Sequence, residues 1–190
     1  MDIGFSLIYA VLVTLFFRED LNLTIVLLSV VFGLLPDFDV SVEIFQQGML
    51  KGNGDRFHRT LTHFPILYVP IIPVVFLRYG SFWGVLFSVN IISHFLHDSV
   101  GSGWGLKWLW PFSKRSYKIF SHPIHGKLSR NFIVSWGQEE LKISIEKYGD
   151  KNWIKNLYLT FSNTLILELV VFFTGIGILV SIMLIKGYSF

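Results

Sequence analysis

The sequence predicts an all-α integral membrane protein: a bundle of about five membrane-embedded helices with a basic and aromatic loop on one side. Of the 190 residues, 52% are hydrophobic and only 15% are charged, whereas about a quarter of the residues of a soluble domain are charged. The apolar residues gather in five stretches, at about 3–17, 21–35, 64–77, 82–96 and 157–185. Since this length suits one domain, we expect residues 1–190 to form a single membrane-embedded domain.

The first four stretches are shorter than the roughly 20 residues that cross a bilayer comfortably. A polar turn at residues 18–20 separates the first two, which we therefore expect to form an antiparallel hairpin. Prolines within residues 65–73 should bend the third stretch without excluding it from a membrane. A cleavable signal peptide is not expected, because Asp2 is the only charged residue before residue 18.

The positive charges predict an orientation. If all five stretches span, 13 of the 16 Lys and Arg residues fall on one side, and the other side carries Arg18, Arg78 and Lys186. The positive-inside rule places the richer side in the cytoplasm. We therefore expect a multi-pass protein of the inner membrane, with its N-terminus inside, its C-terminus outside and residues 98–156 as an insertion on the cytoplasmic side.

The insertion mixes aromatic and basic residues. Residues 101–120 combine glycines and lysines with Trp104, Trp108 and Trp110, a composition typical of a membrane interface. Residues 131–149 place their apolar side chains close to one helical face, at Ile133, Leu141, Ile145 and Tyr148. This pattern predicts a short amphipathic helix on the membrane or over a site, and an ordinary surface helix is the alternative.

Charge and cysteine content limit the partners. The net charge of +3 suits anionic lipid headgroups, and nucleic acid is not expected because the basic residues flank apolar segments. The chain has no cysteine, which excludes disulfides and thiolate metal sites. Any metal must therefore bind histidine, carboxylate or backbone oxygen.

Three groups of such residues fall on the predicted cytoplasmic face. They are Asp37 and Asp39 after the second stretch, His58 and His63 before the third, and His94 and Asp98 at the end of the fourth. The topology follows from apolar runs and Lys/Arg counts alone. Convergence of these six residues on one face therefore predicts a shared metal site.

The spacing also suits metal chemistry. His94 and Asp98 are four residues apart, about 40° around a helix, so both can reach one ion, with Asn90 one turn earlier to orient a ligand. Asp37 and Asp39 can bridge two ions, or supply one ligand and one base. Imidazole with carboxylate favours zinc, with manganese or iron as alternatives, and the share of carboxylates leaves magnesium open.

Each feature also has an ordinary structural explanation. Paired aspartates often terminate a helix, and we interpret His97, His122 and His125 as packed or surface residues. Polar residues at membrane depth are costly, however, and mark functional sites. Glu168, inside the last apolar stretch, needs a cationic partner. A bound metal is one candidate, and structural pairing with Arg or Lys is the other.

Three motifs together carry a resemblance: "LLPDFD" containing residues 36–39, "HRTLTH" at residues 58–63, and "HFLHD" at residues 94–98 followed by a Pro-Phe pair at 111–112. They resemble the YdjM-like family of membrane-bound metal-dependent hydrolases, the LexA-binding inner-membrane group. The resemblance covers about residues 30–113, with a looser echo around Glu168.

The family in turn is similar to the zinc-dependent phospholipase C and P1 nuclease group, whose helical folds hold clusters of zinc ions. The resemblance thus implies phosphoester hydrolysis. Two departures stand out. Asp2 is the only polar candidate near the N-terminus, where family members commonly carry a histidine, so one ligand is replaced or lost. Thr60 follows Arg59, where the family usually has glycine.

We therefore expect a hydrolase of lipid-like phosphoesters at the inner leaflet, with two or three divalent metals. The expected metal ligands are Asp37, Asp39, His58, His63, His94, Asp98 and Glu168. Asp37 or Asp39 would be the general base, and Arg59 would clamp a phosphate oxygen, with Asp55 as a weaker supporting candidate.

Two other functions remain open. One is a non-catalytic membrane protein whose metal fixes the bundle and whose basic loop binds a protein partner. A metal-ion transporter is the weaker one, because Glu168 is the only carboxylate near the midplane of an apolar stretch.

Overall fold

The computed structural model describes residues 1–38, 62–100, 104–121, 128–149, 152, 155–156 and 159–187. The chain forms two compact units. Unit 1 comprises Met1–Leu35, Val69–His94 and Phe161–Phe190, and unit 2 comprises Pro36–Tyr68 and Phe95–Thr160. One of the boundaries between the units, between His94 and Phe95, falls inside a continuous helix.

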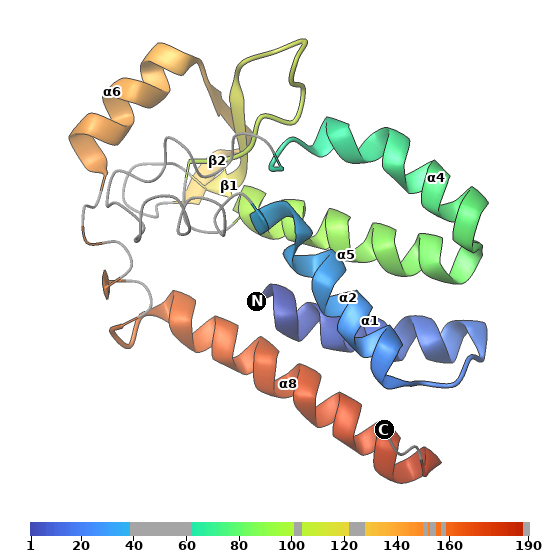
Figure 1. Ribbon diagram of the computed structural model, residues 1–190. Coiled ribbons are helices and arrows are strands. Elements are labelled where there is room, and N and C mark those ends of the chain that lie inside the picture. Colours follow the sequence, from blue (N-terminus) through green and yellow to red (C-terminus); the bar gives the residue numbers. More distant parts are fainter. Residues whose placement is uncertain are drawn as a thin grey trace. The chain divides into compact units, whose positions relative to one another are not determined.

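Unit 1 is built of apolar helices (Figure 1). They are α1 (Asp2–Phe17), α2 (Leu23–Leu34), α4 (Tyr68–Tyr79, from Val69), α5 (Ser81–Val100, up to His94) and α8 (Asn163–Lys186). The polar turn predicted at residues 18–20 is present: Arg18 ends α1 in the left-handed region (φ 59°), and the Asn22 side chain accepts a hydrogen bond from Ile25 N at 3.1 Å to start α2. Helices α1 and α2 also contact each other, as expected for the predicted hairpin.

Helix α1 packs against both α2 and α8. Its contact with α8 depends on two glycines. A Cβ atom on Gly4 would lie 2.6 Å from Val171 O, and one on Gly175 would lie 2.6 Å from Gly4 O. Any larger residue at either position must push the helices apart. Small residues at this contact let the two backbones approach, as is common between membrane helices.

The prediction of five membrane-spanning helices is not supported. Among the described residues, α8 alone is both long and apolar enough to cross a membrane. Only 6% of its most apolar 18 residues are buried. Helices α1, α2 and α4 have 16, 12 and 12 residues, and at about 1.5 Å per residue they fall short of a ~30 Å hydrocarbon core. Helix α5 has 20 residues but carries Asn90, His94, His97 and Asp98.

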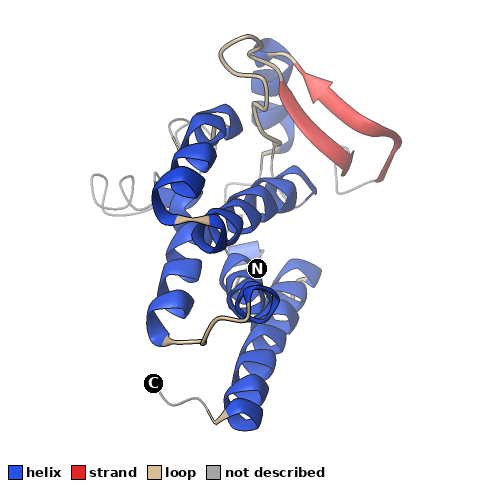
Figure 2. Cartoon of the chain, turned by 90° about the vertical axis from the view of Figure 1, so that its right-hand side faces the viewer, coloured by secondary structure: helices blue, strands red, loops and turns tan. Residues whose placement is uncertain are grey.

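Unit 2 contains a β-hairpin, so the expectation of an all-α fold is wrong in this region (Figure 2). It comprises the short 3-10 helices η1 (Leu35–Asp37, from Pro36) and η3 (Pro65–Leu67), strands β1 (Ser116–Ser121) and β2 (Leu128–Trp136), and helix α6 (Gln138–Tyr148). The strands are antiparallel, with Ser116 opposite Trp136 and Ile119 opposite Ile133.

The predicted amphipathic helix begins seven residues later than expected. Residues 132–136, "FIVSW", are β-branched or aromatic apart from one serine and pair with β1, so Ile133 belongs to a strand. Helix α6 starts after Gly137, whose N–H donates to the Glu140 carboxylate at 2.7 Å. A glutamate that accepts from the backbone N–H three residues earlier is typical of a helix N-terminus. The helix periodicity was real, but it applied only beyond Gly137.

Candidate metal centre

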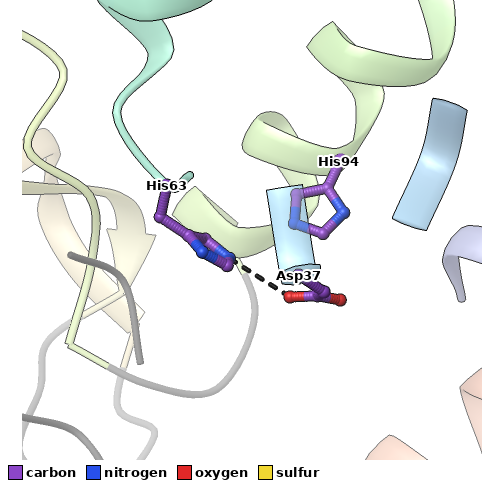
Figure 3. A group of neighbouring side chains, drawn as sticks. All are labelled: Asp37, His63 and His94. Atoms are coloured by element: carbon purple, nitrogen blue, oxygen red, sulfur yellow. Dashed lines mark ion pairs between the residues drawn. The ribbon is translucent and has the colours of Figure 1, made fainter. Parts of the chain in front are cut away.

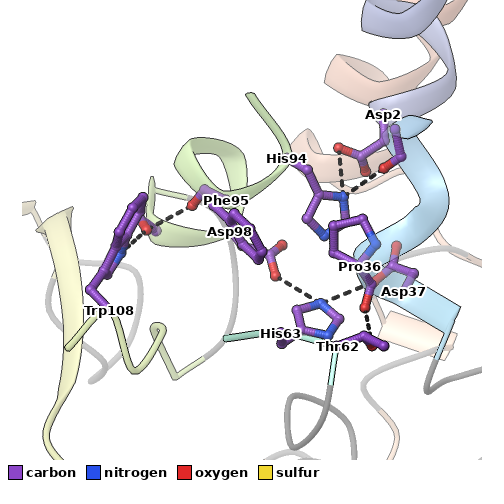
Figure 4. Close-up of polar contacts among 11 residues, drawn as sticks. Asp2, Pro36, Asp37, Thr62, His63, His94, Phe95, Asp98 and Trp108 are labelled. Atoms are coloured by element: carbon purple, nitrogen blue, oxygen red, sulfur yellow. Dashed lines mark hydrogen bonds and ion pairs between the residues drawn. The ribbon is translucent and has the colours of Figure 1, made fainter. Parts of the chain in front are cut away.

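His63 is positioned by a link between two of the sequence motifs. The Thr62 hydroxyl donates to the carbonyl oxygen of Pro36 at 2.6 Å (Figure 4). This bond holds the segment that carries His63 against the segment that carries Asp37. The neighbouring Phe64 stacks on Trp110 with ring centroids 4.5 Å apart and the planes 7° from parallel. The result is an imidazole side chain with no exposed surface, 0%.

Two carboxylates face the same nitrogen of His63. Its Nε2 atom lies 3.2 Å from Asp37 Oδ1 and 3.5 Å from Asp98 Oδ2, all within unit 2. Charge-assisted hydrogen bonds are shorter, about 2.7–2.9 Å. Two ligands each 2.0–2.1 Å from a tetrahedral zinc ion would be about 3.3 Å apart. The spacing therefore fits ligands around a cation better than a hydrogen-bonded pair.

The end of α5 that carries Asp98 is fixed by its neighbours. The Ser99 hydroxyl donates to Phe95 O at 2.7 Å and accepts from Trp108 Nε1 at 2.9 Å. Phe95 also meets Tyr68 edge to face, with ring centroids 5.3 Å apart. The aromatic residues of the insertion thus hold the helical turn that presents the carboxylate.

His94 lies one helical turn before Asp98, and its Nδ1 atom has two polar neighbours. In unit 1, its Nδ1 atom is 2.9 Å from the carbonyl oxygen of Gly33 and 3.5 Å from Asp2 Oδ1. A carbonyl oxygen only accepts hydrogen bonds, so Nδ1 must carry the proton in this bond. In the neutral ring Nε2 is then unprotonated, which is the arrangement that metal-binding histidines use.

The structure brings three of the predicted ligands together. Within unit 2, Asp37 and Asp98 face His63, and Figure 3 draws the pair of Asp37 and His63. His94 stands one helical turn before Asp98 on α5. Two imidazoles with one or more carboxylates form a donor set that suits zinc or manganese. The residues present therefore fit a divalent metal ion.

A buried polar network holds the middle of α5 in unit 1. The Asn90 amide nitrogen donates to Ser29 Oγ at 3.0 Å and to Leu86 O at 2.8 Å, and its oxygen accepts from Ser6 Oγ at 2.6 Å. The Ser29 hydroxyl in turn donates to Ser6 O at 2.7 Å. These bonds fix α5 against α1 and α2, one turn from His94, while the predicted role of Asn90 in orienting a metal ligand stays a prediction.

Glu168 has a different neighbour from the one expected. Its Oε2 atom lies 3.6 Å from the amino group of Met1 within unit 1. The cationic neighbour of Glu168 is thus the amino group of Met1, whereas the sequence suggested a metal ion or an Arg or Lys side chain. His97, interpreted from the sequence as a packed or surface residue, lies on α5 next to Asp98.

Several predicted residues lie outside the described part of the chain: Asp39, Asp55, His58, Arg59, His122 and His125. Their roles stay predictions. Two contributors were missed altogether, the carbonyl of Gly33 and the hydroxyl of Thr62. Thr62 stands inside the "HRTLTH" motif and could have been suspected, but a backbone carbonyl leaves no signal in a sequence.

The YdjM inner membrane protein family matches residues 2–185, nearly the whole chain. The chain belongs to this family. Comparison with curated proteins and with solved structures returned no significant match. Membership of the YdjM family confirms the expected location in the inner membrane. Hydrolysis and similarity to phospholipase C stay predictions. Within the YdjM match lie all the residues of the His/Asp group.

Proposed function

We propose that this protein is a membrane-bound, metal-dependent hydrolase of phosphoester substrates. The observation that carries the proposal is the buried imidazole of His63 with two carboxylate oxygens 3.2 and 3.5 Å from one nitrogen. Two carboxylates around one buried ring are costly to keep together unless a cation compensates them. We assign Asp37, His63, His94 and Asp98 to hold that cation, with Asp39 and His58 as further ligands.

A divalent ion at such a site supplies Lewis acidity and lowers the pKa of a water to about 7. The protein's own residues then have defined tasks. His63 and His94 offer neutral nitrogens, with the proton of His94 kept on the side of Gly33. Asp37, whose side chain is 34% exposed, is the carboxylate best placed to accept a proton from solvent-side water. Arg59 would neutralise a phosphate oxygen.

The proposed substrate is lipid-like. The polar residues lie at the ends of apolar helices, and only 6% of the most apolar part of α8 is buried. Trp108 and Trp110 contact the segments that carry Asp98 and His63, and tryptophans of this kind favour the headgroup layer of a membrane. We infer that phospholipid or isoprenyl phosphate esters enter from the cytoplasmic leaflet, the side indicated by the Lys and Arg distribution.

The test compares Asp98→Asn with a matched control on the same helix. The full chain is purified in detergent, stripped with a chelator and assayed on phosphodiester and phosphomonoester reporters with zinc or manganese added. Asp98→Asn keeps the size of the side chain but removes its charge. We expect it to lose more than about a hundred-fold in metal-dependent turnover, because even outer residues of a metal site cost 10–100-fold. His97→Gln, next to Asp98, should retain both metal and activity.

The outcomes separate an enzyme from a scaffold. A structural metal would leave no turnover to lose on any ester class, and Asp98→Asn would unfold far below the wild-type temperature. That pair of results would replace the hydrolase with a membrane protein whose metal fixes the helices and whose basic insertion binds a partner. Membrane sidedness is tested independently, by reporter fusions at residue 120, expected in the cytoplasm, and at the C-terminus, expected outside.

A further inference from the structure

Asp2 and His94 lie opposite each other on two antiparallel helices of unit 1. The Asp2 carboxylate is 3.5 Å from His94 Nδ1. One turn along both helices, the Ser6 hydroxyl donates to Asn90 Oδ1 at 2.6 Å. Residues four apart share a helix face, so these are two successive contacts of one interface. The second contact is buried on both sides and holds the first turn of α1 beside His94.

The Nδ1 proton of His94 therefore has two acceptors of different character. Gly33 O, at 2.9 Å, is a neutral carbonyl that makes the hydrogen bond. Asp2 Oδ1, at 3.5 Å, is too far for a good hydrogen bond but close enough for strong electrostatic attraction inside a protein. Only the carboxylate can offset the positive charge that a histidine ring gains when its other nitrogen binds a cation.

We propose that Asp2 is a positioning residue of the metal centre, holding the proton of His94 on Nδ1 and strengthening Nε2 as a ligand. The inference rests on the proposed metal site, but not on hydrolysis. Carboxylates that contact the far nitrogen of a metal-binding histidine typically raise metal affinity 10–100-fold.

An ordinary explanation is that Asp2 only stabilises the N-terminus of α1, where negative charge is favourable. That role predicts a change in stability and none in the ring of His94. Two substitutions separate the roles. Asp2→Asn removes the charge but keeps an oxygen that can face Nδ1, whereas Asp2→Leu removes both. Leucine is preferred to alanine because a large second residue prevents the enzymatic removal of Met1. The amino group of Met1 lies 3.6 Å from Glu168 and should be kept.

Two measurements test the proposal on the full chain in detergent. The first is the ¹⁵N chemical shifts of the His94 ring in metal-free protein, assigned with His94→Gln, because these shifts report which nitrogen carries the proton. The second is affinity for Co²⁺ or Zn²⁺ by titration. Glu19→Ala serves as the control, since it removes an exposed carboxylate at the opposite end of α1.

We expect wild-type His94 to be protonated on Nδ1. Asp2→Leu should mix the two tautomers and weaken metal binding about 10–100-fold. Asp2→Asn should keep the tautomer and bind metal with intermediate affinity, and Glu19→Ala should match wild type. An Nε2 proton in the wild type, or unchanged shifts and affinity in Asp2→Leu, would overturn the proposal. If metal binding follows this order but no ester is hydrolysed, the proposed hydrolase fails while the role of Asp2 stands.

Discussion

Two buried polar clusters in this protein differ in charge and in spacing. In unit 1, Ser6, Ser29 and Asn90 are neutral, and their hydrogen bonds measure 2.6–3.0 Å. In unit 2, His63 faces Asp37 and Asp98 at 3.2 and 3.5 Å. The first cluster satisfies its own donors and acceptors. The second brings two negative groups to one ring nitrogen at distances longer than a charge-assisted hydrogen bond.

The difference indicates which cluster has a ligand to hold. Neutral side chains that complete one another fix helices together, and adding an ion would gain nothing. Carboxylates gathered around a buried imidazole repel each other and are stabilised by a cation between them. Burial of a polar residue therefore does not by itself mark a functional site here. Charge together with spacing does.

The largest effect should come from removing His63. In wild type, divalent metal at a thousand times its Kd should add about 4 kcal/mol to the free energy of unfolding, and a chelator should remove that increment. His63→Leu should show no metal-dependent increment, because Asp37 and Asp98 lose their shared partner. Thermal unfolding in detergent with and without metal measures both. An equal increment in His63→Leu would show that the ion binds elsewhere.

Breaking the neutral cluster should be the next largest effect, and of a different kind. Asn90→Leu leaves the buried hydroxyls of Ser6 and Ser29 without their amide partner, at a cost of about 3 kcal/mol in unfolding free energy. Ser88→Ala on the same helix is the control, because the Ser88 hydroxyl bonds only to Gly84 O of its own helix in the described contacts. Denaturant unfolding of metal-free protein gives the comparison. Equal stability of the two variants would contradict the structural role of the cluster.

The apolar packing of unit 1 can be tested with two neighbouring glycines of α8. Gly175→Leu should destabilise the protein by about 2 kcal/mol, since its side chain would enter the backbone of Gly4. Gly177→Leu should be close to neutral, because a Cβ atom there meets nothing within 4 Å. The unfolding free energies of the pair decide whether α8 packs on α1 through Gly175. Similar losses in both variants would mean that it does not.

The smallest effect should follow from loosening the link beside the charged cluster. Thr62→Val keeps the shape of the side chain but removes the 2.6 Å hydrogen bond to Pro36 O. We expect a loss of about 1 kcal/mol in stability and a modest loss of metal affinity, because His63 and Asp37 are then held less firmly. Titration with zinc measures the second effect. Unchanged affinity would show that other contacts suffice to position His63.

Much of the candidate site could be predicted from the sequence. The four residues Asp37, His63, His94 and Asp98 stand in short motifs at the ends of apolar stretches. Because His94 and Asp98 are four residues apart, helix geometry alone places them on one face of a helix. The number of membrane spans could not be predicted in the same way. The apolar stretches became helices of 12 to 24 residues, and how a membrane accommodates them depends on their neighbours.

The sequence by itself determined the residue types, the helical periodicity of unit 1 and the absence of thiolate chemistry, because these depend on composition and on neighbours within a few positions. The tertiary structure decided what each buried group faces. It paired residues 132–136 with β1 instead of extending α6, and set Glu168 beside Met1. It also placed the carbonyl oxygen of Gly33, 61 residues away, where it accepts a hydrogen bond from His94 Nδ1. Such contacts join distant parts of the chain, and only the packing of helices brings their atoms within reach.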